Sequence, residues 1–554
     1  MSSISKHHIG HYIYIYESTS YWDSKSKCPS NRRKSIGMID PDTGNEYFKQ
    51  EYINQLAREG KPTDGMKVWK DQRKNTSLQD NLDSEAMALA QEILSTVKNY
   101  GLAYFLQTIA ENIGLVEILR QAMPVCWQKV LVLASYLVAE DKPVAYCSDW
   151  VEVNECPDTG SMASQRISEL LCAFGYNERT KFYKQWYLRV RENEYIALDI
   201  TSVSSYSENM SFIEWGHNRD EERLPQINIC MLFGEKSIMP IYQTLYSGSL
   251  TDVTTLDATL SEFEAITGTR DIMLITDKGF YKEKNVNKLL GDDEHPPYKF
   301  LIPVSFTCNF AKDRVNEERG GIDNVDNVIL THNCDMPIRG IHRLCTWKKD
   351  IQLHTHIFYD PEQALRERND IYGYVAKLKK KAMEDCEDSK LQKSFQEYLI
   401  LNKKPDGAVT VSIRKDAVEK VTQHSGWLIL ISNDIVDAQE ALDLYRAKDV
   451  VEKAFYQYKN NLGLDRLRVH SDERALNKTF IAFIALIISS HIRKVMRDSG
   501  LEDIFAFGKL LSTLSKLKIA YVKGIPILQP LTKEQKLIFK SFAMELPGAL
   551  NAHA

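Results

Sequence analysis

Three acidic residues, from distant parts of the chain, could carry chemistry. Asp199 lies inside the apolar segment Tyr195–Val203 (YIALDITSV), and Asp277 directly follows the apolar segment Asp271–Thr276 (DIMLIT). A buried carboxylate is costly unless a partner neutralises it, and ligand sites gather at strand ends in open α/β sheets. Glu452 lies in a helical pattern further along the chain. These three acids are therefore candidate catalytic residues of the chain.

The helical segment around Glu452 carries further polar residues on the same side. With 3.6 residues per turn, Tyr445, Lys448, Glu452 and Lys459 share one face. Simpler interpretations remain open for each position. The helix face is also typical of an exposed ion-pair ladder, Asp277 could cap the next helix, and Asp199 could face solvent at a sheet edge.

The elements around the acids predict an α/β fold. Six segments rich in β-branched and apolar residues are strand candidates: Tyr195–Val203, Gln226–Phe233, Ser237–Leu245, Asp271–Thr276, Tyr298–Val304 and Trp427–Ser432. One helix is expected over Thr254–Ile266 and a long one from Ile435 to about Lys459. The first three strands are consecutive, which favours a meander.

Changes in the pattern of apolar and polar residues along the chain predict several domains, as expected for 554 residues. We expect 1–80 as an N-terminal β unit, 81–190 as a helical region that could bind DNA, 191–304 as the first part of the core, 305–425 as an inserted subdomain, 426–500 as the second part of the core, and 501–554 as a helical tail.

Composition predicts a soluble, cytoplasmic protein without membrane spans. The chain is 43% hydrophobic and 26% charged, lacks a CxxC pair, and its longest apolar run, Phe480–Ile488, is too short to cross a bilayer. The formal net charge of −5 is unusual for a protein that binds nucleic acid. Two local clusters of lysine and arginine, at 25–34 and 377–381, are equally typical of solvated surface.

Taken together, these blocks resemble the DDE transposases of bacterial insertion sequences, in the group with a Tyr-x2-Arg-x3-Glu-x6-Lys signature. The matching stretches are YIALDITSVSSYSE, WGHNRD, LPQINICMLF, GSLTDVTTL, LITDKGFY, GWLILISND and YRAKDVVEKAFYQYK. The resemblance covers roughly Tyr195 to Ile492. It implies an RNase H-like catalytic core interrupted by a mostly β insertion, with a β-plus-helical N-terminal region and a helical C-terminal tail.

The resemblance also implies roles for individual residues. The catalytic acids and metal ligands would be Asp199, Asp277 and Glu452. The phosphate contacts of the signature would fall on Tyr445 and Lys459. Lys448 stands where the family has a DNA-contacting arginine; lysine keeps the charge but loses the bidentate fork, so a looser phosphate contact is expected there.

Three more residues are candidates for contact with DNA. Trp427 matches a tryptophan that in relatives fills the space of a flipped base, although a core aromatic at a strand start is an equal alternative. Arg219, in WGHNRD between Asn218 and Asp220, and Lys278, beside the second acid, are the others. For Lys278, solvation of the loop is the slightly favoured alternative.

The expected chemistry is phosphodiester cleavage followed by strand transfer with two Mg²⁺ ions, for which Mn²⁺ could substitute. The expected partners are the terminal inverted repeats of the element and target DNA, bound by a homodimer, with the protein associated with the nucleoid when bound. Alternatives are an RNase H-like nuclease or resolvase that does not transpose, and a domesticated DNA-binding relative, which predicts loss of an acid. A glycosidase with paired carboxylates is remote because the signature helix would have no role.

Overall fold

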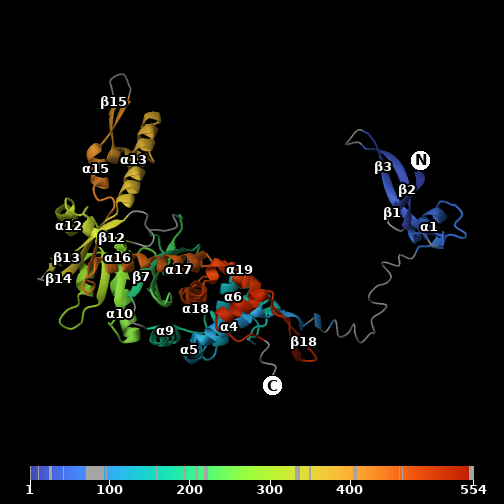
Figure 1. Cartoon of the computed structure of the whole chain (residues 1–554), viewed down its shortest axis with the longest axis horizontal. Coiled ribbons are helices and arrows are strands. Elements are labelled where there is room, and N and C mark those ends of the chain that lie inside the picture. The colour runs from blue at the N-terminus through green and yellow to red at the C-terminus, as the bar shows by residue number, and fades with distance from the viewer. Residues whose placement is uncertain are drawn as a thin grey trace. The chain divides into compact units, whose positions relative to one another are not determined.

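The computed structural model divides the chain into two compact units, which we describe separately (Figure 1). The first comprises Met1–Thr96 with Tyr521–Ile525, and the second comprises Val97–Ala520 with Pro526–Ala554. The residues described are 2–9, 12–23, 28–41, 43–69, 91, 93–94, 96–157, 160–191, 195–207, 210–216, 222–330, 337–348, 351–403, 409–460, 462–464 and 466–547.

The first unit is a five-stranded sheet with a helix. In sheet order its strands are β1(Ser2–Ile9), β2(Tyr12–Asp23), β3(Cys28–Ile39), β4(Glu46–Phe48) and β5(Lys67–Val68), and its helix is α1(Gln50–Arg58). The alternating YIYIY pattern places Ile15 in a small core with Ile36 and Tyr52. The expected N-terminal β structure is therefore present in the described residues.

The second unit is built on a nine-stranded sheet. In sheet order its strands are β12(Val328–Ile329), β13(Ile338–Thr346), β14(Gln352–Tyr359), β17(Trp427–Ser432), β11(Lys299–Pro303), β10(Met273–Thr276), β7(Tyr195–Ser204), β8(Gln226–Gly234) and β9(Pro240–Ser247). The strands β7, β8 and β9 form an antiparallel meander. β10 runs parallel to both β7 and β11, and β17 runs antiparallel to β11. Every residue of β8 is buried, which explains its uninterrupted apolar sequence.

Helices α16(Ala438–Ala447) and α17(Asp449–Asn460) cover one face of this sheet. Because side chains alternate along a strand, Ile275 of β10 and Leu301 of β11 share this face, and both pack in a cluster with Leu442 and Leu444 of α16. The neighbouring residues Leu274 and Ile302 belong to the main core instead.

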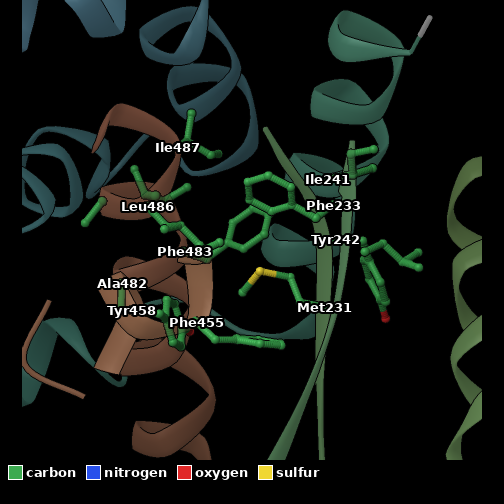
Figure 2. Close-up of a cluster of buried hydrophobic side chains, with 14 of the residues drawn as sticks. Met231, Phe233, Ile241, Tyr242, Phe455, Tyr458, Ala482, Phe483, Leu486 and Ile487 are labelled. Atoms are coloured by element: carbon green, nitrogen blue, oxygen red, sulfur yellow. The ribbon is translucent and has the colours of Figure 1, made fainter. Parts of the chain in front are cut away.

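A long buried helix, α18(Asp472–Asp498), completes the core behind α17. Its composition alone would suit a membrane span, but 89% of its most apolar window is buried inside the protein. Figure 2 shows Met231 and Phe233 of β8 directed toward Phe455 of α17 and Phe483 of α18. The apolar run that we judged too short for a membrane is therefore the centre of the core.

Further helices occupy the rest of the second unit up to β11. They are α4(Gly101–Asn112), α5(Leu115–Ala122), α6(Trp127–Ala139), η1(Val144–Tyr146), α7(Cys147–Val153), α8(Ser164–Leu170), α9(Tyr176–Val190), α10(Asp252–Thr267), η2(Lys278–Phe280) and α11(Glu283–Leu289). The helices expected over 81–190 are present from Gly101 onward, whereas most of 81–96 lies outside the described residues.

The predicted mostly β insertion is wrong in two respects. First, β13 and β14 extend the central sheet, because β14 pairs with β17 from His354↔Ser432 to Tyr359↔Trp427. Second, the remainder is mainly helical, namely α12(Asn309–Glu318), η3(Val325–Asn327), α13(Pro361–Glu384), α14(Gln392–Tyr398), β15(Leu399–Lys403), β16(Val409–Ile413) and α15(Lys415–Thr422).

Residues 361–425 form what we call the α13–α15 excursion. They leave the sheet after β14 and return at β17, and the backbone N–H of Asp360 donates a hydrogen bond of 2.8 Å to the carbonyl of Gly426. The excursion has its own small core, which includes Val375, Leu378 and Phe395. It therefore begins and ends at one point of the sheet.

The expected helical C-terminal tail also needs correction. It contains η5(Leu501–Asp503), α19(Phe507–Ser515) and α20(Lys533–Ser541), but also the strands β18(Lys518–Val522) and β19(Ile525–Leu528). These strands form a small sheet with β6(Lys98–Asn99), in which Lys518 pairs with Asn99. The pairing joins segments far apart in sequence, so a local pattern could not reveal it.

Candidate active site

The side chain of Asp199 lies inside the central sheet. Its strand, β7, is flanked by β8 and β10, and the residue is only 5% exposed. Its Oδ1 accepts a hydrogen bond of 2.7 Å from the N–H of Ile200. The alternative interpretation, in which Asp199 faces solvent at a sheet edge, is therefore wrong.

Asp277 lies beside Asp199 on the neighbouring strand. Thr276 pairs with Leu198 in the parallel register of β10 and β7, so the next residue of each chain segment is an aspartate. Asp277 precedes η2 but makes no side-chain hydrogen bond that caps it. Its Oδ1 lies 3.1 Å from Nζ of Lys448 instead. The simple helix-capping interpretation therefore fails.

Glu452 comes from α17, on the face of the sheet that carries the two aspartates. Its Oε1 lies 3.6 Å from Nζ of Lys448, one turn earlier. The expected continuous helix is interrupted at Lys448, which separates α16 from α17. One turn or more after this break, the hydroxyl of Tyr458 lies 2.7 Å from Oε1 of Gln243 in β9 and 2.8 Å from the carbonyl oxygen of Thr479 in α18, between which its single proton is shared. These contacts hold α17, and with it Glu452, against the sheet.

Lys448 is the centre of this arrangement, because its buried ammonium group faces all three acids. The residue is 5% exposed. Burial lowers the pKa of Lys448, but the charges of Asp277 and Asp199 outweigh this effect and raise the pKa above its ordinary value. The phosphate contact expected of Lys448 stays a prediction.

Tyr445 lies next to Lys448, whose Nζ is 5.8 Å from the centre of the tyrosine ring. Burial raises the pKa of Tyr445 to about 12, and Asp277, Glu452 and Asp199 add to this rise. The hydroxyl is thus neutral at physiological pH and can act as a hydrogen-bond donor beside the acids.

The donor set fits a divalent cation in its chemistry. Three carboxylates gather around a single buried ammonium group, which leaves an excess of negative charge and oxygen donors of the kind that Mg²⁺ prefers. The spacing is wider than one ion requires, since within the described ranges no three His, Cys, Asp or Glu side chains lie close enough to hold one metal ion. Lys448 is the cation that occupies the space between them.

The other predicted site residues lie apart from the three acids or outside the described residues. Lys459 is half-buried, and its positive charge contributes to lowering the pKa of Glu222, which lies near the end of β7. Trp427 is 8% exposed, with its ring 5.0 Å from that of Tyr359, as expected for a core aromatic at a strand start. Arg219, like its neighbours in the HNRD stretch, lies outside the described residues.

Lys278 is exposed, and its Nζ lies 5.5 Å from the centre of the Phe306 ring. Lys312 and Arg319 lie in the same region of the structure. Their positive charges lower the pKa of His424, and the imidazole of His424 stacks on the Phe306 ring. Sequence reasoning missed these two cations because they lie in a different segment and have no motif or spacing that relates them to Lys278.

Comparison with known proteins identifies the family of the chain. The family described as "Transposase DDE domain" matches residues 191–488, which is just over half of the chain and contains all three acids. No curated protein matches. Among solved structures, the chain is similar to one described as "Cryo-EM structure of piggyBac transposase synaptic complex with hairpin DNA", with 9% identity, 85% of this chain and 84% of that chain covered, and a TM-score of 0.31. That score is too low to carry an argument, so the identification rests on the family match: the chain belongs to the DDE transposase family.

Proposed function

We propose that the protein is a transposase that binds the ends of its own element and cuts and joins DNA at Asp199, Asp277 and Glu452. The observation that carries this proposal is the convergence of the three acids, from β7, the end of β10 and α17, on the ammonium group of Lys448. The family match alone identifies the domain in the sequence, but it does not show that the three acids lie close together in space.

We further propose that the core is RNase H-like and that the chain is of the bacterial insertion-sequence type. The antiparallel meander of β7 to β9, followed by β10 and β11 in parallel to β7, supports this fold. The spacing of Tyr445, Glu452 and Lys459 supports the signature of that group, with lysine at 448 in place of arginine.

Asp199, Asp277 and Glu452 would hold two Mg²⁺ ions, which activate the attacking oxygen and stabilise charge on the leaving oxygen. The protein supplies the rest. Burial of Asp199 and the anchoring of α17 set the positions of the carboxylates before substrate binds. The neutral hydroxyl of Tyr445 can donate a hydrogen bond to a phosphate oxygen beside them. The partner is DNA, and we propose a homodimer on the paired ends.

Replacement of each acid by its amide tests this assignment. Asp199→Asn, Asp277→Asn and Glu452→Gln should each slow cleavage of a duplex that contains the DNA flanking the gene by roughly 10³-fold or more, as expected of groups that act as a unit. Binding of the same duplex should persist. Asp449→Asn is the matched control, because Asp449 is exposed on α17 and, within the described part of the chain, no ion pair or hydrogen bond joins it to the three acids. Cleavage retained by any of the three amide variants would remove that residue from the site.

The alternative of a nuclease or resolvase is separated by the products. A transposase joins the cleaved end to a second DNA molecule, whereas a nuclease yields only cut ends. We expect the joined product with Mg²⁺ or Mn²⁺, and its absence despite efficient cutting would favour the alternative. The presence of all three acids already argues against a non-catalytic domesticated relative.

A further inference from the structure

Three cations gather at the sheet edge beside Asp277. Lys278 follows β10, Lys312 lies on α12, and Arg319 directly follows that helix. We call them the edge cluster. They surround a stacked pair of rings, Phe306 and His424, whose centres are 4.6 Å apart at an angle of 7°.

The sheet topology explains why these residues meet. Parallel strands β10 and β11 end at the same edge, so Lys278 and Phe306 emerge side by side. β17 runs antiparallel to β11 and therefore begins at that edge, which brings the preceding residue His424 to the same place. Arg319 is tied there because its guanidinium donates to the carbonyl of Gln423 at 2.7 Å.

The positive charges of the edge cluster are not neutralised within the described part of the chain. None of Lys278, Lys312 or Arg319 makes an ion pair with a described carboxylate. The two glutamates at the end of α12 are engaged elsewhere: Glu317 binds Arg314 at 2.6 Å, and Glu318 binds Arg343 at 2.7 Å.

The surroundings of His424 report the same excess of positive charge. Burial lowers the pKa of His424, and Arg319, Lys312 and Lys278 each lower it further, with no carboxylate acting in the opposite direction. A set of cations held together without a counter-ion is a site for an anion.

We propose that the edge cluster binds backbone phosphates of the DNA strand next to the phosphodiester held at Asp277. This inference rests on the proposed function, which makes DNA the substrate. Lys278 is adjacent to Asp277 in sequence, and successive phosphates rise only about 3.4 Å along one strand of a duplex. A strand engaged at the acids therefore passes the three cations. Phosphate rather than base is the ligand, because the aromatic rings already stack on each other and Lys278 lies over Phe306.

The salt dependence of DNA binding tests this proposal. The probe is a fluorescein-labelled duplex of the DNA that flanks the gene, titrated at several NaCl concentrations and followed by fluorescence anisotropy. Each lost phosphate contact lowers the slope of log K against log salt by about 0.9, so the double variant Lys312→Gln, Arg319→Gln should lose about 2. Lys420→Gln, which removes an exposed charge on the nearby α15, should leave the slope unchanged.

Two further measurements separate charge from structure. Arg319→Lys keeps the cation but changes the hydrogen bond to Gln423, so it should retain the slope. Binding of Mn²⁺ by calorimetry should be the same in the double variant and the wild type. A slope in the double variant equal to that of Lys420→Gln would overturn the proposal, as would loss of Mn²⁺ binding. If the wild type itself failed to bind the duplex, the proposed function would fail as well.

Discussion

At the scale of single residues, Lys448 is the most informative position. The resemblance implies a phosphate contact at this position, which stays a prediction; the structure shows a buried side chain whose ammonium lies 3.1 Å from Asp277 and 3.6 Å from Glu452. It acts as an internal counter-ion that lets three carboxylates face one another without metal. A divalent cation bound by the same carboxylates must displace or shift this ammonium group, because like charges in one site repel.

Lys448→Met should therefore separate stability from metal binding. Without divalent ions the variant should unfold at lower temperature, because the acids lose their counter-ion. Its affinity for Mn²⁺ should rise by about tenfold, equivalent to about 1.4 kcal/mol, because the competing charge is gone. Calorimetric titration and thermal denaturation measure the two effects. The control Lys453→Met removes an exposed charge from the same helix and should change neither. Equal or weaker Mn²⁺ binding by Lys448→Met would contradict competition between lysine and metal.

The acids could be predicted at this scale, whereas the edge cluster could not. Asp199 and Asp277 interrupt or end apolar segments, and such positions stand out in a single sequence. Lys312 and Arg319 lie in an ordinary charged helix, and their relation to Lys278 arises only when β11 and β17 pair. No local pattern encodes that proximity.

At the scale of elements, β14 and the start of α16 meet through a buried histidine. His356 is fully buried, and its Nε2 lies 3.1 Å from the carbonyl of Ile435. Burial lowers the pKa of His356 to about 4; the hydrogen bond to Ile435 and the charge of Asp437 raise the pKa, and His342 and His354 lower it further. Burial of this ring between β14 and the segment that precedes α16 therefore favours a neutral imidazole.

Acid should accordingly weaken the fold through His356. Its pKa is about 4 in the folded chain and about 6.5 in the unfolded chain, so the unfolded chain takes up the proton first as pH falls. The loss of folding stability caused by His356 is negligible well above pH 6.5 and reaches about 2 kcal/mol at pH 5. His356→Gln should lose less stability than the wild type between pH 7 and pH 5, as measured by urea unfolding. His295→Gln, at an exposed site, should behave like the wild type. An unchanged pH dependence in His356→Gln would refute this assignment.

The elements themselves were predicted unevenly. Strands of the core were located to within a few residues, because runs such as WLILIS and QINICMLF are buried on both faces and have no helical period. The strands β13 and β14 were expected only as part of a separate, mostly β subdomain, because a sequence does not show that β14 pairs with β17. The break at Lys448 was missed for a similar reason: the residues on both sides of it suit a helix, and the interruption carries no glycine or proline.

At the scale of the whole molecule, the division into two units predicts that the site does not need the N-terminal sheet. All three acids, Lys448 and the edge cluster belong to the second unit, which starts at Val97. A chain that begins at Val97 should fold with a single cooperative transition and bind Mn²⁺ with the affinity of the full chain, as calorimetry would measure. Loss of Mn²⁺ binding in a folded truncated chain would show that the first unit contributes to the site.

The hydrogen bond between Asp360 and Gly426 has a consequence for how such a protein can change over time. The α13–α15 excursion departs and returns at one place, and Tyr359 pairs with Trp427 across its base. Without the excursion, β14 and β17 would be joined by an ordinary hairpin turn in the same register. A single insertion or deletion of DNA could therefore lengthen, replace or remove this arm while the three acids stay in place. Of the edge cluster and the two rings that it surrounds, only His424 would be lost, together with the Gln423 carbonyl that holds Arg319. Descendants of this chain would be free to diverge most at the arm.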